Sequence, residues 1–152
     1  MDPLLSISDL SRLIQLAVAP VFLLAGIAGF LNVMSGRLGR IVDRSRVVEL
    51  RSLSLKDEAK RERAQVELRV LRKRIRLNNW SIGFCTLSGL LVCMLVVTLF
   101  AGSYWGINVS GEIVVFFVAA MVALIVALVL FIQETLLATR TLRDASEVLG
   151  SD

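Results

Sequence analysis

Residues 37–76 read RLGRIVDRSRVVELRSLSLKDEAKRERAQVELRVLRKRIR and hold 14 of the chain's 17 lysines and arginines. Uncharged, apolar sequence lies on both sides of this basic segment. Residues 13–36 run for 24 residues without a charge, residues 77–111 for 35, and, after Glu112, residues 113–133 for 21. The hydrocarbon core of a bilayer is about 30 Å thick and needs roughly 20 apolar helical residues to cross it. The sequence therefore predicts three membrane spans, with the basic segment between the first two.

The expected fold class is all-α, an integral membrane protein with a single membrane domain over residues 1–152. Hydrophobic residues make up 56% of the chain and the mean hydropathy is +0.75, which is too apolar for a soluble domain of this length. A buried soluble bundle would not need charge-free runs this long. We expect spans at about residues 13–36, 80–103 and 113–133, a cytoplasmic helical hairpin at 37–79, and a tail at 134–152.

The distribution of charge predicts the orientation. Residues 37–76 carry 14 basic and 6 acidic residues, net +8, and the remainder carries 3 basic and 7 acidic residues, net −4, which together give +4. Short loops rich in lysine and arginine are retained in the cytoplasm. We therefore expect the hairpin and the tail from Glu134 to be cytoplasmic, and the N-terminus and the loop at residues 104–112 to lie outside. Tyr104 and Trp105 would then lie in an outer aromatic belt.

The basic segment is expected to form two helices that pack against each other. The break falls at residues 52–55, and Ser54 with Asp57 three residues later resembles a capping box that starts the second helix. The first helix has a partial apolar stripe of Leu38, Ile41, Val42 and Val48. The second has apolar residues that recur at helical spacing and predict a seam between the helices: Ala64, Leu68, Leu71 and Ile75.

Positive charge is concentrated at the two ends of the hairpin. Residues 37–48 are net +3 and residues 68–76 net +5, whereas residues 49–67, around the turn, are net zero. The orientation signal itself accounts for most of this pattern. The functional alternative is a basic collar that binds anionic lipid headgroups or concentrates anions near a pore. Nucleic acid is not an expected partner, because the basic residues lack interleaved aromatics. The candidate lipid-headgroup residues are Arg37, Arg40, Arg44, Arg69, Arg72 and Arg76.

The sequence offers little for catalysis, and we expect neither an enzyme nor a cofactor. There is no histidine, which removes the commonest general base and metal ligand. Cys85 and Cys93 lie eight residues apart in the second span, too far apart to share a metal ion or a disulfide within one helix. We therefore predict no catalytic residues and no metal site.

The first span carries a face that is small or polar through its inner half, which we call the first-span stripe: Gln15, Val18, Phe22, Gly29, Asn32 and Gly36. Small residues allow helices to approach closely in lipid, and a buried Asn can bond across an interface. The stripe is therefore either a helix-packing seam or the lining of a pore around a symmetry axis. In a pore, Asn32 and Gln15 would face water, and Val18 with Phe22 would form an apolar constriction that gates by dewetting.

The other two spans also carry small faces, which predict helix–helix contacts. These are Ser81, Cys85 and Ser88 in the second span, and Ala119, Ala123 and Ala127 in the third. Three spans offer few internal surfaces to bury all these faces. We therefore expect a homo-oligomer.

Two stretches carry a family resemblance. They are LAVAPVFLL at residues 16–24, followed by Gly26 and Gly29, and RLGRIVDR at residues 37–44. The chain resembles a widespread bacterial family of small membrane proteins catalogued as a domain of unknown function, over about residues 7 to 135. The resemblance implies a bacterial inner-membrane protein with three spans, and it supplies no catalytic residues.

Three hypotheses for function remain from the sequence. The first is a homo-oligomeric ion channel lined by the first span. The second is a non-conducting membrane scaffold or regulatory subunit whose hairpin binds anionic lipid or a partner protein. The third, an integral-membrane enzyme, ranks last because no acid–base or nucleophile constellation is present. The channel hypothesis leads narrowly.

Overall fold

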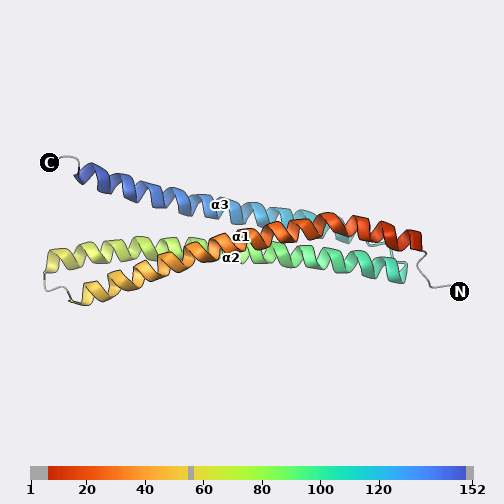
Figure 1. The fold of residues 1–152 in the computed structure, drawn as a ribbon, viewed down its shortest axis with the longest axis horizontal. Coiled ribbons are helices and arrows are strands. Elements are labelled where there is room, and N and C mark those ends of the chain that lie inside the picture. The colour runs from red at the N-terminus through yellow and green to blue at the C-terminus, as the bar shows by residue number, and fades with distance from the viewer. Residues whose placement is uncertain (1–6, 55–56, 150–152) are drawn as a thin grey trace. The chain divides into compact units, whose positions relative to one another are not determined.

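The fold consists of three long helices (Figure 1): α1 (Ile7–Ser54), α2 (Glu58–Trp105) and α3 (Ser110–Leu149). It was obtained as a computed structural model that describes residues 7–54 and 57–149, and the side chains of residues 11–54 and 57–137. The predicted all-α class is confirmed. Each helix contains a segment long and apolar enough to cross a membrane, and these segments are Ser11–Ser54, Glu58–Trp105 and Ser110–Leu137. Three such helices indicate a multi-pass membrane protein.

The chain divides into two compact units. Unit 1 comprises Met1–Leu31 with Phe84–Ile125, and unit 2 comprises Asn32–Gly83 with Val126–Asp152. Within each helix, buried positions recur at intervals of seven residues. In α1 these are Pro20, Ile27, Met34, Ile41 and Val48; in α2 they are Ala64, Leu71, Asn78, Cys85 and Val92. A seven-residue repeat keeps one side of a helix against its neighbours, as in a coiled coil.

Unit 2 contains the helical hairpin, in which the end of α1 and the start of α2 lie side by side and antiparallel (Figure 1). Its core holds Ile41 and Val48 from α1 and three residues of α2, with Ile75 packed against them. The predicted apolar seam is therefore confirmed. The three core residues of α2 are Ala64, Leu68 and Leu71.

The start of α2 differs in detail from the sequence expectation. The backbone N–H of Ala59 donates to Oδ1 of Asp57 at 3.2 Å, so Asp57 is the capping residue. The hydroxyl of Ser54 instead donates to the carbonyl of Arg51 at 2.9 Å, within α1. The predicted capping box that begins at Ser54 is therefore wrong, because this serine belongs to the end of the preceding helix.

Unit 1 packs α2 against α3 through small residues. Ser88 Oγ donates to the carbonyl of Ala120 at 2.8 Å, and both residues are fully buried. Ala123 and Ala127 are also buried, which confirms that part of the predicted contact face, but the buried alanine near its start is Ala120, whereas Ala119 was predicted. Nearly every position of a span is apolar, so the sequence does not fix which of two adjacent alanines faces inward.

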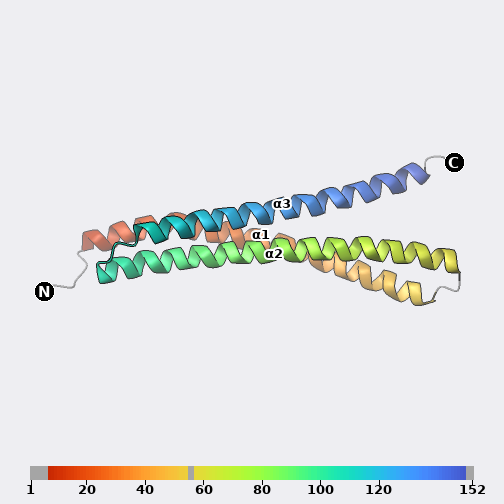
Figure 2. The ribbon, with the colours of Figure 1, turned by 180° about the vertical axis from the view of Figure 1, so that it is seen from behind.

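The connection between α2 and α3 is shorter than the predicted loop at residues 104–112. Figure 2 shows that a tight turn joins the two helices, and only residues 106–109 lie outside them. Gly106 has φ +64°, a conformation that glycine adopts without steric cost. The rings of Tyr104 and Trp105 meet edge to face, 5.9 Å apart, and both side chains are exposed at the end of α2.

Candidate functional site

A buried carboxylate in unit 2 binds two arginines. Glu134 has no solvent exposure, and its Oε2 accepts a hydrogen bond from Nη2 of Arg37 at 2.8 Å. Its Oε1 accepts from Nε and Nη2 of Arg74 at 3.1 and 2.9 Å. One residue from each helix therefore meets at this point. A carboxylate can remain ionised away from water only when it is paired and hydrogen-bonded in this way.

Other contacts from α3 hold Arg37 in place. Its Nη1 donates to Oγ1 of Thr135 at 3.0 Å, and its guanidinium lies over the ring of Phe131, 4.9 Å from the centroid. Oγ1 of Thr135 in turn donates to the carbonyl of Phe131 at 3.0 Å. Arg37 thus uses a charge pair, a neutral hydrogen bond and a cation–π contact, and its orientation is closely defined.

A second buried polar layer lies next to these charges. Asn78 Nδ2 donates to the carbonyl of Met34 at 3.1 Å, and Ser81 Oγ donates to the carbonyl of Ala127 at 2.6 Å. The side chains of Asn78 and Ser81 are fully buried, and Oδ1 of Asn78 has no hydrogen-bond partner among the described residues. We call the set Arg37, Arg74, Asn78, Ser81 and Glu134 the Glu134 junction.

The Glu134 junction links α1, α2 and α3 within unit 2 through buried polar bonds. Two arginines against one carboxylate leave a net charge of +1. Burial of charged groups is expensive unless they are paired and hydrogen-bonded, as these are. The arrangement is suited to fixing helix positions and to presenting positive charge.

Sequence reasoning missed this junction because it assigned Glu134 to a solvated tail. The periodicity of α2 carried a signal. When the seam of Ala64, Leu68 and Leu71 is extended by steps of three and four, it reaches Arg74, Asn78 and Ser81. A buried stripe that includes an arginine predicts an acidic partner, and Glu134 is the acid that directly follows the third apolar run.

The first-span stripe lies on the side of α1 away from the buried positions. All six of its residues, Gln15, Val18, Phe22, Gly29, Asn32 and Gly36, are exposed. A Cβ atom built on Gly29 or Gly36 would meet no other atom within 4 Å. These two glycines are therefore not used for close packing within either unit, whereas Val18 and Phe22 line an apolar cavity with Val96 and Phe100 of α2.

The exposed sides of the other two spans are mostly large and apolar, and α1 exposes such side chains as well, among them Leu16 and Val33. In α2 the exposed side chains include Leu87, Leu90, Met94 and Val97, and in α3 they include Val114, Phe117, Val118, Val122 and Ile125. Such large aliphatic and aromatic side chains suit contact with lipid tails. The small faces of α2 and α3, in contrast, are buried against neighbouring helices.

The structure brings together only part of the predicted lipid-headgroup set. Arg37, Arg40 and Arg44 line one cavity of about 460 Å³, together with Arg74 and Ile41. The other three predicted residues, Arg69, Arg72 and Arg76, are exposed elsewhere on α2 and do not line this cavity. Arg74 was not among the predicted headgroup residues.

Two further features concern metal and thiol chemistry. Cys85 is buried and Cys93 is exposed, and both are free thiols. Among the side chains of residues 11–54 and 57–137, no group of three or more His, Cys, Asp or Glu is placed to hold a metal ion.

Comparison with known proteins places the chain in a family. The model of the family described as "Protein of unknown function (DUF2721)" matches residues 17–144. The matched range includes the whole Glu134 junction and most of the first-span stripe. No curated protein and no solved structure matches the chain.

Proposed function

The chain belongs to the DUF2721 family of proteins of unknown function, and we propose that it is a homo-oligomeric ion channel of the bacterial cytoplasmic membrane. In this proposal the first-span stripe of α1 surrounds the symmetry axis. The hairpin and the C-terminal tail are cytoplasmic, and the N-terminus and the turn at residues 106–109 lie outside. No catalytic step is assigned to the protein.

The observation that carries the proposal is the contrast between the exposed faces of the three spans. Asn32 and Gln15 are amides exposed on α1, beside exposed glycines and large apolar side chains such as Phe22, whereas the exposed mid-span residues of α2 and α3 are mostly large and apolar. Amide side chains that face hydrocarbon leave their hydrogen-bonding groups unsatisfied. The α1 face therefore favours contact with water or another protein surface, and α2 and α3 favour contact with lipid.

Self-association through α1 satisfies these requirements with no second protein. Glycine at positions 29 and 36 permits close approach of helices related by a rotation axis. Asn32 would form a polar ring on that axis, and Val18 and Phe22 an apolar ring. A narrow apolar ring of this kind closes a pore by dewetting and opens when it widens or hydrates.

Conduction is tested directly in reconstituted vesicles. Purified protein is inserted into liposomes loaded with a potassium- or chloride-sensitive dye, and its oligomeric state is determined by native mass spectrometry. We expect an oligomer and an ion flux that rises with protein density. A monomer, or the absence of flux at every voltage and pH applied, contradicts the proposal.

Substitution of Asn32 separates a pore lining from a packing seam. If Asn32 faces water on the axis, Asn32→Leu adds an apolar ring, so the oligomer persists while flux falls. If Asn32 bonds a neighbouring helix, the same change costs about 0.6–2 kcal/mol of interhelical bonding and overfills a small face, so the oligomer dissociates. We expect the first result. Val122→Leu, on the exposed face of α3, is the matched control and should change neither measurement.

The proposed orientation has its own test. A reporter fused after Asp152 is expected to read cytoplasmic and one placed before Asp2 periplasmic, because the lysine and arginine excess lies between residues 37 and 76. Both reporters on one side of the membrane would contradict a three-span topology.

A membrane scaffold is the second candidate, and one observation favours it. Among the described residues of the hairpin, large apolar side chains that are more than half exposed stand between the charged ones: Val47, Leu50, Leu53 and Val66. Exposed apolar side chains grouped on a polar surface are typical of protein contact sites. An intact oligomer with no ion flux, which loses a hairpin-bound partner when Leu50 is changed to Asp, would favour the scaffold over the channel.

A further inference from the structure

Four arginines of unit 2 line one cavity. Arg37, Arg40 and Arg44 come from α1 and Arg74 from α2, and Ile41 completes a cavity of about 460 Å³. No carboxylate is among these lining residues. Four like charges around one space repel one another unless other groups fix them or an anion occupies the space.

Two acids outside the lining hold three of the four guanidinium groups. Glu134 binds Arg37 and Arg74, as described above. Oε1 of Glu67 accepts hydrogen bonds from Nε and Nη2 of Arg44 at 3.2 and 2.9 Å. Each of the three guanidinium groups donates two hydrogen bonds within the protein. Since a guanidinium carries five N–H donors, about three remain on each.

The charge balance of the cavity is positive. Four arginines and the two carboxylates that bind them give a net charge of +2. Arg40 makes no ion pair among the described residues and is exposed. A ligand with one or two negative charges would balance this arrangement without disturbing Glu134 or Glu67.

We propose that this cavity, lined by Arg37, Arg40, Arg44 and Arg74, binds a phosphate group. Guanidinium forks match pairs of phosphate oxygens, and phosphate offers enough acceptors to bond several forks at once. The fixed arginines lose little conformational freedom on binding, which favours a discrete site over loose attraction to a charged surface.

The position of the cavity favours a phospholipid headgroup as the source of the phosphate. Arg37 follows directly after the charge-free run at residues 13–36, and Arg74 lies three residues before the run at 77–111. Both arginines therefore sit at the boundary between apolar and charged sequence, where headgroups of anionic lipids lie. The inference rests on the membrane placement proposed above but does not require ion conduction.

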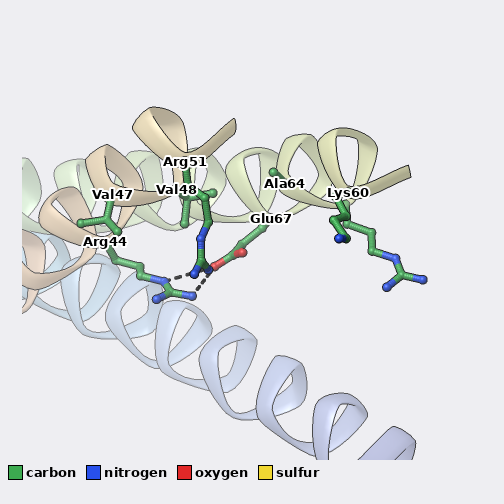
Figure 3. Close-up of a pocket in the computed structure, with 8 residues that line it drawn as sticks. Arg44, Val47, Val48, Arg51, Lys60, Ala64 and Glu67 are labelled. Carbon is green, nitrogen blue, oxygen red and sulfur yellow. Dashed lines mark hydrogen bonds and ion pairs between the residues drawn. The ribbon is translucent and has the colours of Figure 1, made fainter. Parts of the chain in front are cut away.

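A neighbouring basic cavity of about 390 Å³ serves as an internal comparison (Figure 3). It is lined by Arg44, Arg51 and Lys60, but also by Glu67, whose carboxylate lies among the basic side chains. A lining carboxylate repels phosphate and competes for the same donors. This second cavity lies farther along the hairpin from the apolar runs, so it is the poorer phosphate site.

The test is lipid binding to delipidated protein in a nonionic detergent, followed by native mass spectrometry. The protein is titrated with phosphatidylglycerol, and with phosphatidylcholine as the zwitterionic reference. The variant Arg40→Gln/Arg44→Gln changes two exposed cavity residues and leaves Arg37, Arg74 and Glu134 in place. The matched control Arg69→Gln/Arg76→Gln removes the same charge from exposed residues outside the cavity.

Wild-type protein is expected to retain phosphatidylglycerol in preference to phosphatidylcholine. The cavity variant should raise the Kd for phosphatidylglycerol by about thirtyfold, roughly fivefold for each charge, and the control by less than about threefold. Arg40→Gln alone, which breaks no ion pair among the described residues, should raise it by about fivefold. Equal losses in the two double variants, or no loss in the cavity variant, would overturn the proposal.

A competition arm identifies the source of the phosphate. With a lipid ligand, inorganic phosphate at about 1 mM displaces little phosphatidylglycerol, because the acyl chains add binding energy that the free ion lacks. If phosphate at that concentration displaces phosphatidylglycerol, the cavity still binds a phosphate group, but the assignment of that group to a lipid is overturned. Absence of ion flux from the wild-type protein leaves these binding results unchanged, so the lipid site and the channel can fail separately.

Discussion

Replacement of Glu134 by glutamine is expected to destabilise the protein by about 3 kcal/mol. The carboxylate accepts three charge-assisted hydrogen bonds, from Arg37 and Arg74, and is fully buried. Loss of one partner of a buried ion pair typically costs about 3–5 kcal/mol, because the remaining charge is left uncompensated. The two arginine side chains are 24% and 20% exposed and can be partly solvated, so the expected cost lies at the lower end of that range.

Reversible unfolding by sodium dodecyl sulfate in mixed micelles, followed by circular dichroism, measures this free energy. Glu67→Gln is the control, because Glu67 forms a similar ion pair with Arg44 but is 44% exposed. Exposed pairs contribute about 0–1 kcal/mol. A value for Glu134→Gln within about 0.5 kcal/mol of the control would refute the view that the buried charges hold the three helices of unit 2 together.

Two further predictions use the same unfolding measurement. Leu68→Ala should lower the free energy of unfolding by about 2–5 kcal/mol, because Leu68 lies in the hairpin core. Leu53→Ala, at a 71% exposed position, should change it by less than about 0.5 kcal/mol. Similar losses in the two variants would contradict the assigned core. Asn78→Leu should change stability by less than about 1 kcal/mol, because it removes the bond to the Met34 carbonyl and also the buried, unpartnered Oδ1. A larger loss would mean that Oδ1 is bonded in the membrane.

The fold class and the hairpin core could be predicted because their sequence signals are strong. A charge-free apolar run that is long enough to cross a bilayer is typical of a transmembrane helix. In the hairpin, apolar residues stand among charged ones, so the spacing of Leu68 and Leu71 is easy to see. Within the spans almost every residue is apolar, so the sequence does not show which side of a helix is buried. For this reason Ala119 was predicted to be buried where the structure buries Ala120.

The Glu134 junction could not be predicted by treating each span separately. Glu134 is the first charge after the third apolar run, and Arg37 is the first after the first run. Taken alone, each marks the end of a span. The two residues pair because they lie at the same level along the helices and on faces that point toward each other. To predict this, one must know which positions of the seven-residue repeat face inward in α1, α2 and α3 at once. The same repeat selects Arg74 over its neighbours Lys73 and Arg76.

The position of Glu134 in the chain has a consequence for the order of assembly. Ribosomes deliver α1 and α2 before residue 134 exists, and chains generally fold from the N-terminus during synthesis. At that stage Arg37 and Arg74 face each other with no anion between them, so the α1–α2 pair carries a like-charge repulsion at its junction. Arrival of α3 supplies the carboxylate that binds both arginines. The last helix to be made thus converts a repulsive contact between the first two into an attractive one. A nascent chain truncated before residue 134 should remain an incompletely closed intermediate that quality-control proteases can recognise.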